Sequence, residues 1–315
     1  MKVIAFVFAL TLASVAALAQ VGLPWPGPGG VSAPAGYQGP GNILTGATMW
    51  VGLRAYTAAA ATAHNKAVNV KSTSHSNETC DIGLGSDGFI GGTGSVTSAC
   101  SGADNGVSLS TFCTSNTDCH VVTFYDQSGN SNNQVASTQA VLSISPLKVL
   151  CTTSTPYDTS FNGTPNISIP QPATASYVAQ RTSGTSSFNV VVGFETAGNA
   201  QAGFNNASQQ LFIYGGSAAV GVTTGGAEGT QLAVQTTFDG ANSVIYENGN
   251  NNAGLSPGTG SATSGVISIC VGNGSNGLAG NFWEAGIWQG TTANHTNFPY
   301  SSMNSNQRGT SGWNF

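Results

Sequence analysis

Acid–base chemistry in this chain depends on few carboxylates, because only 12 of its 315 residues are acidic. Asp126 stands where the apolar run VVTFY gives way to the polar loop DQSGNSNNQ. A short acidic side chain there accepts backbone N–H bonds in a sharp turn, and direct contact with a ligand is the alternative role. Glu284 lies in the alternating run NFWEAGIW, where a buried carboxylate requires a hydrogen-bond partner. Without one, it would be a candidate for catalysis.

Other catalytic and metal-binding patterns are missing from the sequence. The four histidines are scattered, no C-x-x-C pair occurs, and neither a G-x-S-x-G elbow nor a phosphate-binding glycine loop is present. Asp81, Asp87 and Asp104 lie in or just after the Gly-rich loop that Cys80 and Cys100 bound. We predict no metal site and no cofactor, and Ca²⁺ held by these loop carboxylates is the open alternative, although no EF-hand spacing supports it.

The second half of the chain alternates short apolar runs with turn residues. The strand-length runs are FNVVVGFET, QQLFIYGG, QLAVQTTF, SVIYEN, GVISICVG and GNFWEAGIW. Asp239-Gly240 and Asn248-Gly249 separate some of these runs, and both pairs are expected to form tight turns with positive φ. Many short strands at this spacing predict an all-β fold of the sandwich type.

The first half contains one run that favours a helix. GATMWVGLRAYTAAAATAH is rich in Ala, and Trp50, Leu53 and Tyr56 are spaced to form one packed face. Residues 1–19 have the charged start, apolar run and A-x-A site of a secretory signal peptide. Residues 20–42 are expected to form a Pro/Gly-rich tether. The remainder, 43–315, is predicted to be a single sandwich domain with this short N-terminal helix.

The six cysteines of an exported chain predict three disulfides. Closeness in sequence favours Cys80 with Cys100 and Cys113 with Cys119. That leaves Cys151 and Cys270 for a bond between distant segments.

Composition limits the partners of the protein. Charged residues make up 6% of the chain, against ~25% in an average globular protein. The net charge of −5 gives no basic surface for nucleic acid. No segment after the signal peptide is apolar for long enough to span a bilayer. We therefore expect a secreted protein whose surface is mostly neutral and polar.

Two motifs resemble those of α-L-arabinofuranosidase B-type catalytic domains. TFCTSNTDCHVVTFYDQSGNSNNQ is similar to that family's small disulfide followed by YDQSGN, and GNGSNGLAGNFWEAG is similar to its "GGDNSNG" motif and following strand. The run from QLAVQTTFDG to FWEAGIWQG also resembles laminin-G-like jelly rolls. The resemblance spans roughly residues 43 to 290 and implies a concanavalin A-like jelly roll.

The same resemblance implies that the family's catalytic residues are missing here. Retaining glycoside hydrolysis requires two carboxyl groups. Asn273 stands where the family motif has its acid/base Asp, and the family's nucleophile stretch has no counterpart. Glu195, in VVVGFETAGN, is the nearest replacement, and Glu284 is the second catalytic candidate.

Three functions therefore compete. The first is a lectin-like module for a polysaccharide or other glycan, which would bind through Asp126, Asn273 and Asn276 and through one exposed ring of Trp283 or Trp288. The two rings are expected on opposite faces of one strand, because five positions separate them. The second is an arabinofuranosidase-like glycoside hydrolase, and the third is a structural or adhesive secreted protein.

Overall fold

A computed structural model of the chain describes residues 37–152, 160–163, 167–182, 188–195, 200–205, 210–217, 219–259, 262–270, 277–309 and 311–315. The chain divides into two units, Met1–Val31 and Ser32–Phe315, and the described residues all belong to the second. Of the predicted signal peptide and tether, only Tyr37–Asn42 fall within the described residues. Tyr37 is buried there, and its hydroxyl donates to the carbonyl of Ala55 at 2.6 Å.

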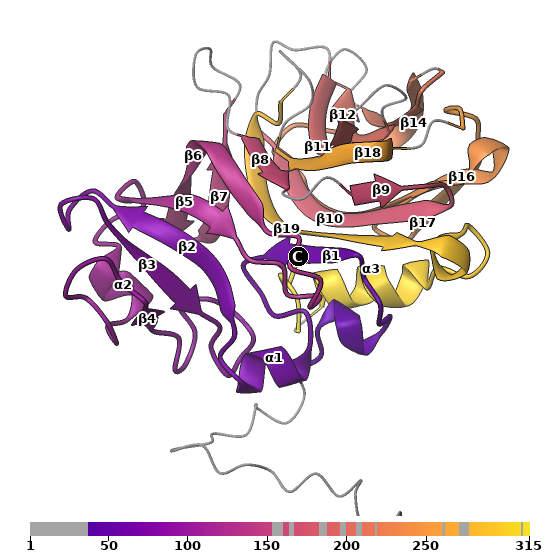
Figure 1. The fold of residues 1–315 in the computed structure, drawn as a ribbon. Helices are drawn as coiled ribbons and strands as arrows, with labels where there is room; N and C mark the ends of the chain where they lie inside the picture. The colour runs from indigo at the N-terminus through magenta and orange to yellow at the C-terminus, as the bar shows by residue number, and fades with distance from the viewer. Residues whose placement is uncertain are drawn as a thin grey trace, which may run out of the picture. The chain divides into compact units, whose positions relative to one another are not determined.

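The described residues form an antiparallel all-β sandwich, as the sequence predicts (Figure 1). One row of hydrogen-bonded strands consists, in spatial order, of β4 (Thr97–Ser98), β3 (Glu78–Gly83), β2 (Lys66–Ser72), β5 (Cys119–Phe124), β6 (Gln134–Ile144), β8 (Ser160–Gly163), β18 (Ala262–Ile269), β11 (Phe188–Glu195), β12 (Ala200–Asn205), β13 (Gln210–Gly215) and β14 (Ala219–Gly225). The short strand β9 (Ile167–Ile169) also pairs with β18.

The second row consists of β17 (Asn250–Leu255), β16 (Ser243–Glu247), β15 (Gln231–Phe238), β10 (Ala173–Arg181) and β19 (Gly280–Gln289). The far edge of β19 pairs with β7 (Leu147–Cys151) near its start and with β1 (Met49–Gly52) near its end. The β6–β7 hairpin links the two rows. Apolar side chains from both rows form the main core, among them Tyr177 and Phe282 from the second row and Val192 and Phe204 from the first.

The helices are short. They are the 3-10 turns η1 (Pro40–Asn42), η2 (Gly240–Asn242) and η3 (Gly290–Ala293) and the α-helices α1 (Ala58–Thr62), α2 (Leu109–Phe112) and α3 (Tyr300–Arg308). Helix α3 packs against the second row through buried side chains such as Met303, Asn304 and Gln307 (Figure 1). Among the described residues, no helix combines the length and hydrophobicity that crossing a membrane would need.

The strand runs of the second half are confirmed, but the long helix predicted over residues 46–64 is wrong. Its first part is β1, whose four residues are all buried, and only Ala58–Thr62 are helical. Strand β1 is enclosed because it pairs with β19, with Trp50 opposite Gly286. A Cβ atom added at Gly286 would lie 2.2 Å from the Trp50 ring, so the close packing of these strands requires glycine there. Tertiary pairing thus overrides a local helical preference.

The two predicted turns also differ from each other. Asn248 and Gly249 both have positive φ, at 44° and 97°, as a two-residue hairpin turn requires. Asp239 instead has φ of −146° and is followed by η2, so β15 and β16 are joined by a longer connection.

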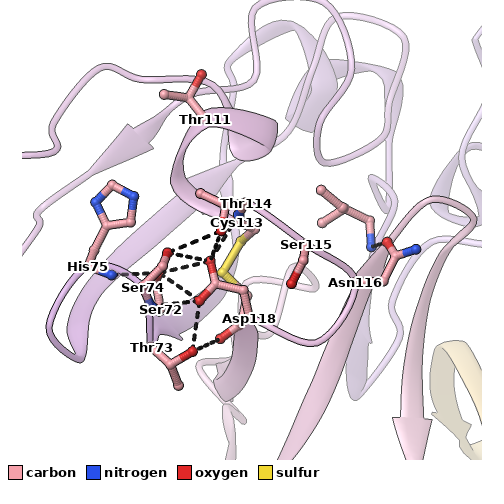
Figure 2. Close-up of a disulfide and its surroundings, with 12 residues drawn as sticks. Ser72, Thr73, Ser74, His75, Thr111, Cys113, Thr114, Ser115, Asn116 and Asp118 are labelled. Carbon is pink, nitrogen blue, oxygen red and sulfur yellow. Dashed lines mark hydrogen bonds between the residues drawn. A yellow bond between two sulfur atoms is a disulfide. The ribbon is translucent and has the colours of Figure 1, made fainter.

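Three disulfides are present, Cys80–Cys100, Cys113–Cys119 and Cys151–Cys270, which are the pairs expected from the sequence. Beside the second of them, the buried carboxylate of Asp118 joins β2 to the disulfide loop (Figure 2). It accepts hydrogen bonds from the hydroxyls of Ser72, Thr73, Ser74 and Thr114, and from the backbone N–H groups of Ser74 and Thr114. Burial alone would raise its pKa, but these hydrogen bonds outweigh burial and hold the pKa of Asp118 well below its ordinary value.

Candidate functional site

Glu284 has a structural partner and does not reach the surface. Its side chain and that of Arg54 are completely buried. The Arg54 guanidinium donates to both carboxylate oxygens, through Nε to Oε2 and through Nη2 to Oε1 at 2.9 Å. Gln307 of α3 donates to Oε1 as well, at 3.0 Å. A carboxylate enclosed in this way cannot contact a ligand, so Glu284 is a link between β19, α3 and the segment after β1.

The expectation that Trp283 or Trp288 exposes a ring for sugar stacking is wrong. Trp283 is 6% exposed and Trp288 is 0% exposed. The Trp283 ring packs near Trp313, and its Nε1 donates to the carbonyl of Leu147 at 2.8 Å. Trp288 packs against Trp50 in a separate apolar cluster. Both faces of β19 are covered, because core strands lie on one side and α3 with the C-terminal residues on the other.

The remaining candidates from the "GNGSNG" region are not tested by the structure. Asn273 and Asn276 lie outside the described residues. Glu195 ends β11, where its backbone pairs with Val266, but its side chain also lies outside the description.

Asp126 holds the DQSGN turn in place. Its Oδ1 accepts from the backbone N–H groups of Trp50 and Ser128, and its Oδ2 accepts from the Ser128 hydroxyl and the Asn132 N–H, all at 2.9 Å. Four donors from the protein therefore surround one carboxylate. The next residue, Gln127, donates through Nε2 to the carbonyl of Arg54 at 3.1 Å and accepts from the N–H of Tyr56 at 2.9 Å. The YDQSGN motif thus ties the loop after β5 to the chain around β1.

This loop forms one wall of an open polar groove. The groove has a volume of about 690 Å³ and is lined by residues that include no charged side chain: Gly46, Ala47, Thr48, Ser128, Asn130, Asn132, Ile167, Ser168 and Gln289. These residues come from four parts of the chain, namely the segment before β1, the loop after β5, strand β9 and the end of β19. Asp126 lies behind the loop and supports it through the bonds to Ser128 and Asn132.

A second hollow, of about 400 Å³, has a different character. Its lining is mostly apolar, with Phe89, Leu109, Ile144 and Leu147, and Asp87 is its charged residue. Asp87 Oδ1 accepts from the N–H of Phe89 at 3.1 Å. The other two carboxylates considered for Ca²⁺ have partners elsewhere, since Asp81 bonds to Asn69 and Tyr125 and Asp104 bonds to His75. The three carboxylates therefore serve separate contacts.

Two histidines form pairs with carboxylates. Nδ1 of His75 lies 2.6 Å from Asp104 Oδ2, and Nδ1 of His295 lies 2.6 Å from Asp239 Oδ2. Nucleophilic catalysis would also require a hydroxyl or thiol bonded to the other ring nitrogen. Within the described part of the chain, neither imidazole ring makes such a bond.

Sequence reasoning identified Asp126 and the polar loop but not the residues that line the groove. Asn130 and Asn132 carried a signal, because three asparagines are clustered within four residues. Thr48 and Gln289 carried none. They join the loop only through the pairing of β1 with the end of β19, and nothing local to either residue predicts that contact.

No protein-family model and no curated protein matches the chain. Its fold is similar to that of a GH54 α-L-arabinofuranosidase soaked with a cyclic sulfate inhibitor, with a TM-score of 0.56 and 15% identity over 85% of this chain. It is equally similar to an arabinofuranosidase complexed with arabinofuranosyl-α-1,2-xylobiose, with a TM-score of 0.56 and 15% identity over 84% of this chain. The chain spans less than two thirds of those proteins, 66% and 64% of their length. Identity this low shows a shared fold and not a shared activity.

Proposed function

We propose that this chain is a secreted carbohydrate-binding module without hydrolytic activity, and that the polar groove is its binding site. The groove itself is the observation that carries the proposal. It offers hydroxyl and amide side chains and no charge over about 690 Å³. Sugars carry many hydroxyl groups, and amide and hydroxyl side chains are suited to binding them.

Three further observations support the proposal. The sandwich has the fold of proteins that act on arabinose-containing sugars, although fold alone does not transfer activity. Glu284, one of the two carboxylates considered for catalysis, is fully occupied by Arg54 and Gln307. The three disulfides favour an oxidising compartment, which agrees with export of the chain.

The proposal is tested by affinity electrophoresis of the mature, oxidised protein in gels that contain neutral polysaccharides. We expect retardation by at least one of arabinan, xylan, β-glucan and dextran, and weaker retardation of the Asn130→Ala variant. Asn251→Ala is the matched control, because Asn251 is an exposed asparagine of β17 outside the groove. Retardation that both variants retain equally would place binding elsewhere, and retardation by none of the polymers would reject a glycan-binding function.

An α-L-arabinofuranosidase-like activity is the second candidate. The fold similarity to GH54 enzymes favours it, and so does the resemblance of residues 272–286 to a catalytic motif. Gly280 and Gln289 lie at opposite ends of β19, roughly 30 Å apart for an extended strand of this length. Groove substitutions should therefore leave any hydrolysis at the Gly280 end of β19 unchanged.

The discriminating assay is release of chromophore from an aryl α-L-arabinofuranoside by the folded protein. We expect no turnover, because Asn273 cannot serve as the acid/base group. Turnover that the Glu195→Gln substitution abolishes would establish the enzyme hypothesis, with Glu195 as one of its carboxylates.

A further inference from the structure

The three side-chain amides that line the groove share one orientation, in which the amide nitrogen bonds to a backbone carbonyl. Asn130 Nδ2 donates to the carbonyls of Ala47 and Thr48, at 2.8 and 3.1 Å. Asn132 Nδ2 donates to the carbonyl of Thr48 at 2.7 Å, and Gln289 Nε2 donates to the carbonyl of Ser168 at 3.0 Å. A backbone carbonyl only accepts hydrogen bonds, so the atom facing it must be the amide nitrogen in all three cases.

The amide oxygens are consequently the atoms left for a ligand. No donor among the described residues bonds to Asn130 Oδ1, Asn132 Oδ1 or Gln289 Oε1. Solvent reaches the amide oxygens of Asn132 and Gln289, since neither is a buried atom without a hydrogen-bond partner. The Asn130 side chain is itself exposed. The groove therefore offers three acceptors supplied by two separate parts of the chain.

A ligand that matches these acceptors must donate hydrogen bonds. The hydroxyl groups of a neutral sugar donate, whereas ionised carboxylate, sulfate and phosphate groups only accept. An anionic group brought to this array would face oxygen lone pairs, on a protein whose net charge is −5. It would lose part of its hydration without gaining a partner from these three amide oxygens.

A divalent cation would also be attracted to oxygen atoms, but the groove is poorly suited to hold one. Ca²⁺ sites normally include carboxylate ligands. No lining residue carries a carboxylate, and the nearby Asp126 already accepts four hydrogen bonds from the protein.

We propose that the groove recognises neutral glycans through hydroxyl groups that act as donors, and that it discriminates against uronic-acid and sulfated glycans. This inference rests on the proposed glycan-binding function and specifies the ligand class of the same site.

The first test compares dextran with dextran sulfate, and arabinan with polygalacturonate, by affinity electrophoresis near physiological ionic strength with and without EDTA. We expect retardation by neutral polymers only, with no effect of EDTA. Stronger retardation by the sulfated or uronic-acid polymer, lost in Asn130→Ala, would overturn the selectivity while leaving glycan binding intact. Binding that EDTA abolishes would overturn it in favour of a metal-dependent site. Binding to no polymer of either charge would reject both the inference and the proposed function.

The second test addresses the donor role directly. For the neutral sugar that binds, analogues with single hydroxyls replaced by fluorine or O-methyl keep an acceptor but lose the donor. We expect about a tenfold loss of affinity for at least one replaced position, the size of one net hydrogen bond. Affinities within twofold for every analogue would show that the hydroxyls do not donate in this site.

A gain-of-function variant completes the design without relying on loss of binding. Gln289 is half-buried at the end of β19, and Gln289→Lys replaces an acceptor with an ammonium donor. We expect this variant to lose affinity for the neutral polymer and to be retarded by dextran sulfate. Unchanged behaviour toward both polymers would contradict the placement of Gln289 in the site.

Discussion

The buried pair of Arg54 and Glu284 allows a quantitative prediction for the Glu284→Gln substitution. Glutamine has nearly the same shape but no charge, and its amide N–H₂ would oppose the N–H donors of Arg54. The guanidinium would then remain fully buried without a counter-charge. Breaking a buried ion pair by removing one partner costs about 3–5 kcal/mol.

That cost corresponds to a measurable change in melting temperature. A folded unit of about 280 residues has an unfolding entropy near 0.6 kcal/mol/K, so the expected decrease in Tm is roughly 5–9 °C. Differential scanning calorimetry or circular dichroism of the oxidised protein at neutral pH would measure it. Glu228→Gln is the matched control, because Glu228 is exposed and its replacement should change stability by no more than about 0.5 kcal/mol.

Two results would refute this reasoning. The first is a Tm for Glu284→Gln no lower than that of the Glu228→Gln control. The second is a double variant, Arg54→Met with Glu284→Gln, whose loss equals the sum of the single losses, since residues in direct contact should show a coupling energy. If Glu284→Gln kept full stability but abolished hydrolysis of an arabinofuranoside, Glu284 would be catalytic instead of structural.

Three further outcomes are expected. Asp118→Asn should lower Tm at neutral pH and should make Tm fall less steeply as the solution is acidified. The pKa of Asp118 is lower in the folded protein than in the unfolded chain. The stability that ionised Asp118 contributes is therefore complete above the unfolded pKa of about 3.9 and is lost as pH falls below it. A full acid-induced decrease in the variant would contradict this assignment. Removing the Cys151–Cys270 bond by serine substitution should lower the free energy of unfolding more than removing Cys113–Cys119. The first bond closes a loop of 119 residues and the second a loop of 6. The chain-entropy estimate for the two bonds is ~5 and ~2 kcal/mol. Equal decreases in unfolding free energy for the two variants, measured by urea unfolding, would contradict this prediction. Asp126→Ala should weaken glycan binding roughly tenfold, about as much as Asn130→Ala, because the loop loses four hydrogen bonds that position it. Unchanged binding, measured by calorimetry, would show that the loop holds its shape without the carboxylate.

The sequence predicted the parts of the fold that local patterns determine. QLAVQTTF coincides with β15, and Asn248-Gly249 adopts the two positive φ angles that its hairpin needs. Cysteine proximity was sufficient to predict the three disulfides, because two short loops left only one pair.

The prediction failed where distant segments meet. Residues 46–64 have the composition of a helix, yet Met49–Gly52 are drawn into a sheet by a strand more than 200 positions away. Trp283 and Trp288 do not lie on opposite faces of β19, because the strand register shifts between Phe282 and Glu284. Both rings lie away from the main core, on the face that α3 and the C-terminal residues bury. Thr48 and Gln289 became groove residues for the same reason, since only tertiary pairing brings them beside the DQSGN loop.

The position of β1 also determines when this protein can fold. β1 precedes its partner β19 by more than 200 residues, and Gln307, which bonds to Glu284, follows β19. A growing chain therefore has no β19 to pair with β1 until more than 200 further residues have been made. Contacts between residues this far apart make completion of the sandwich a slow step, because the entropy of closing so long a loop is lost before the contacts form.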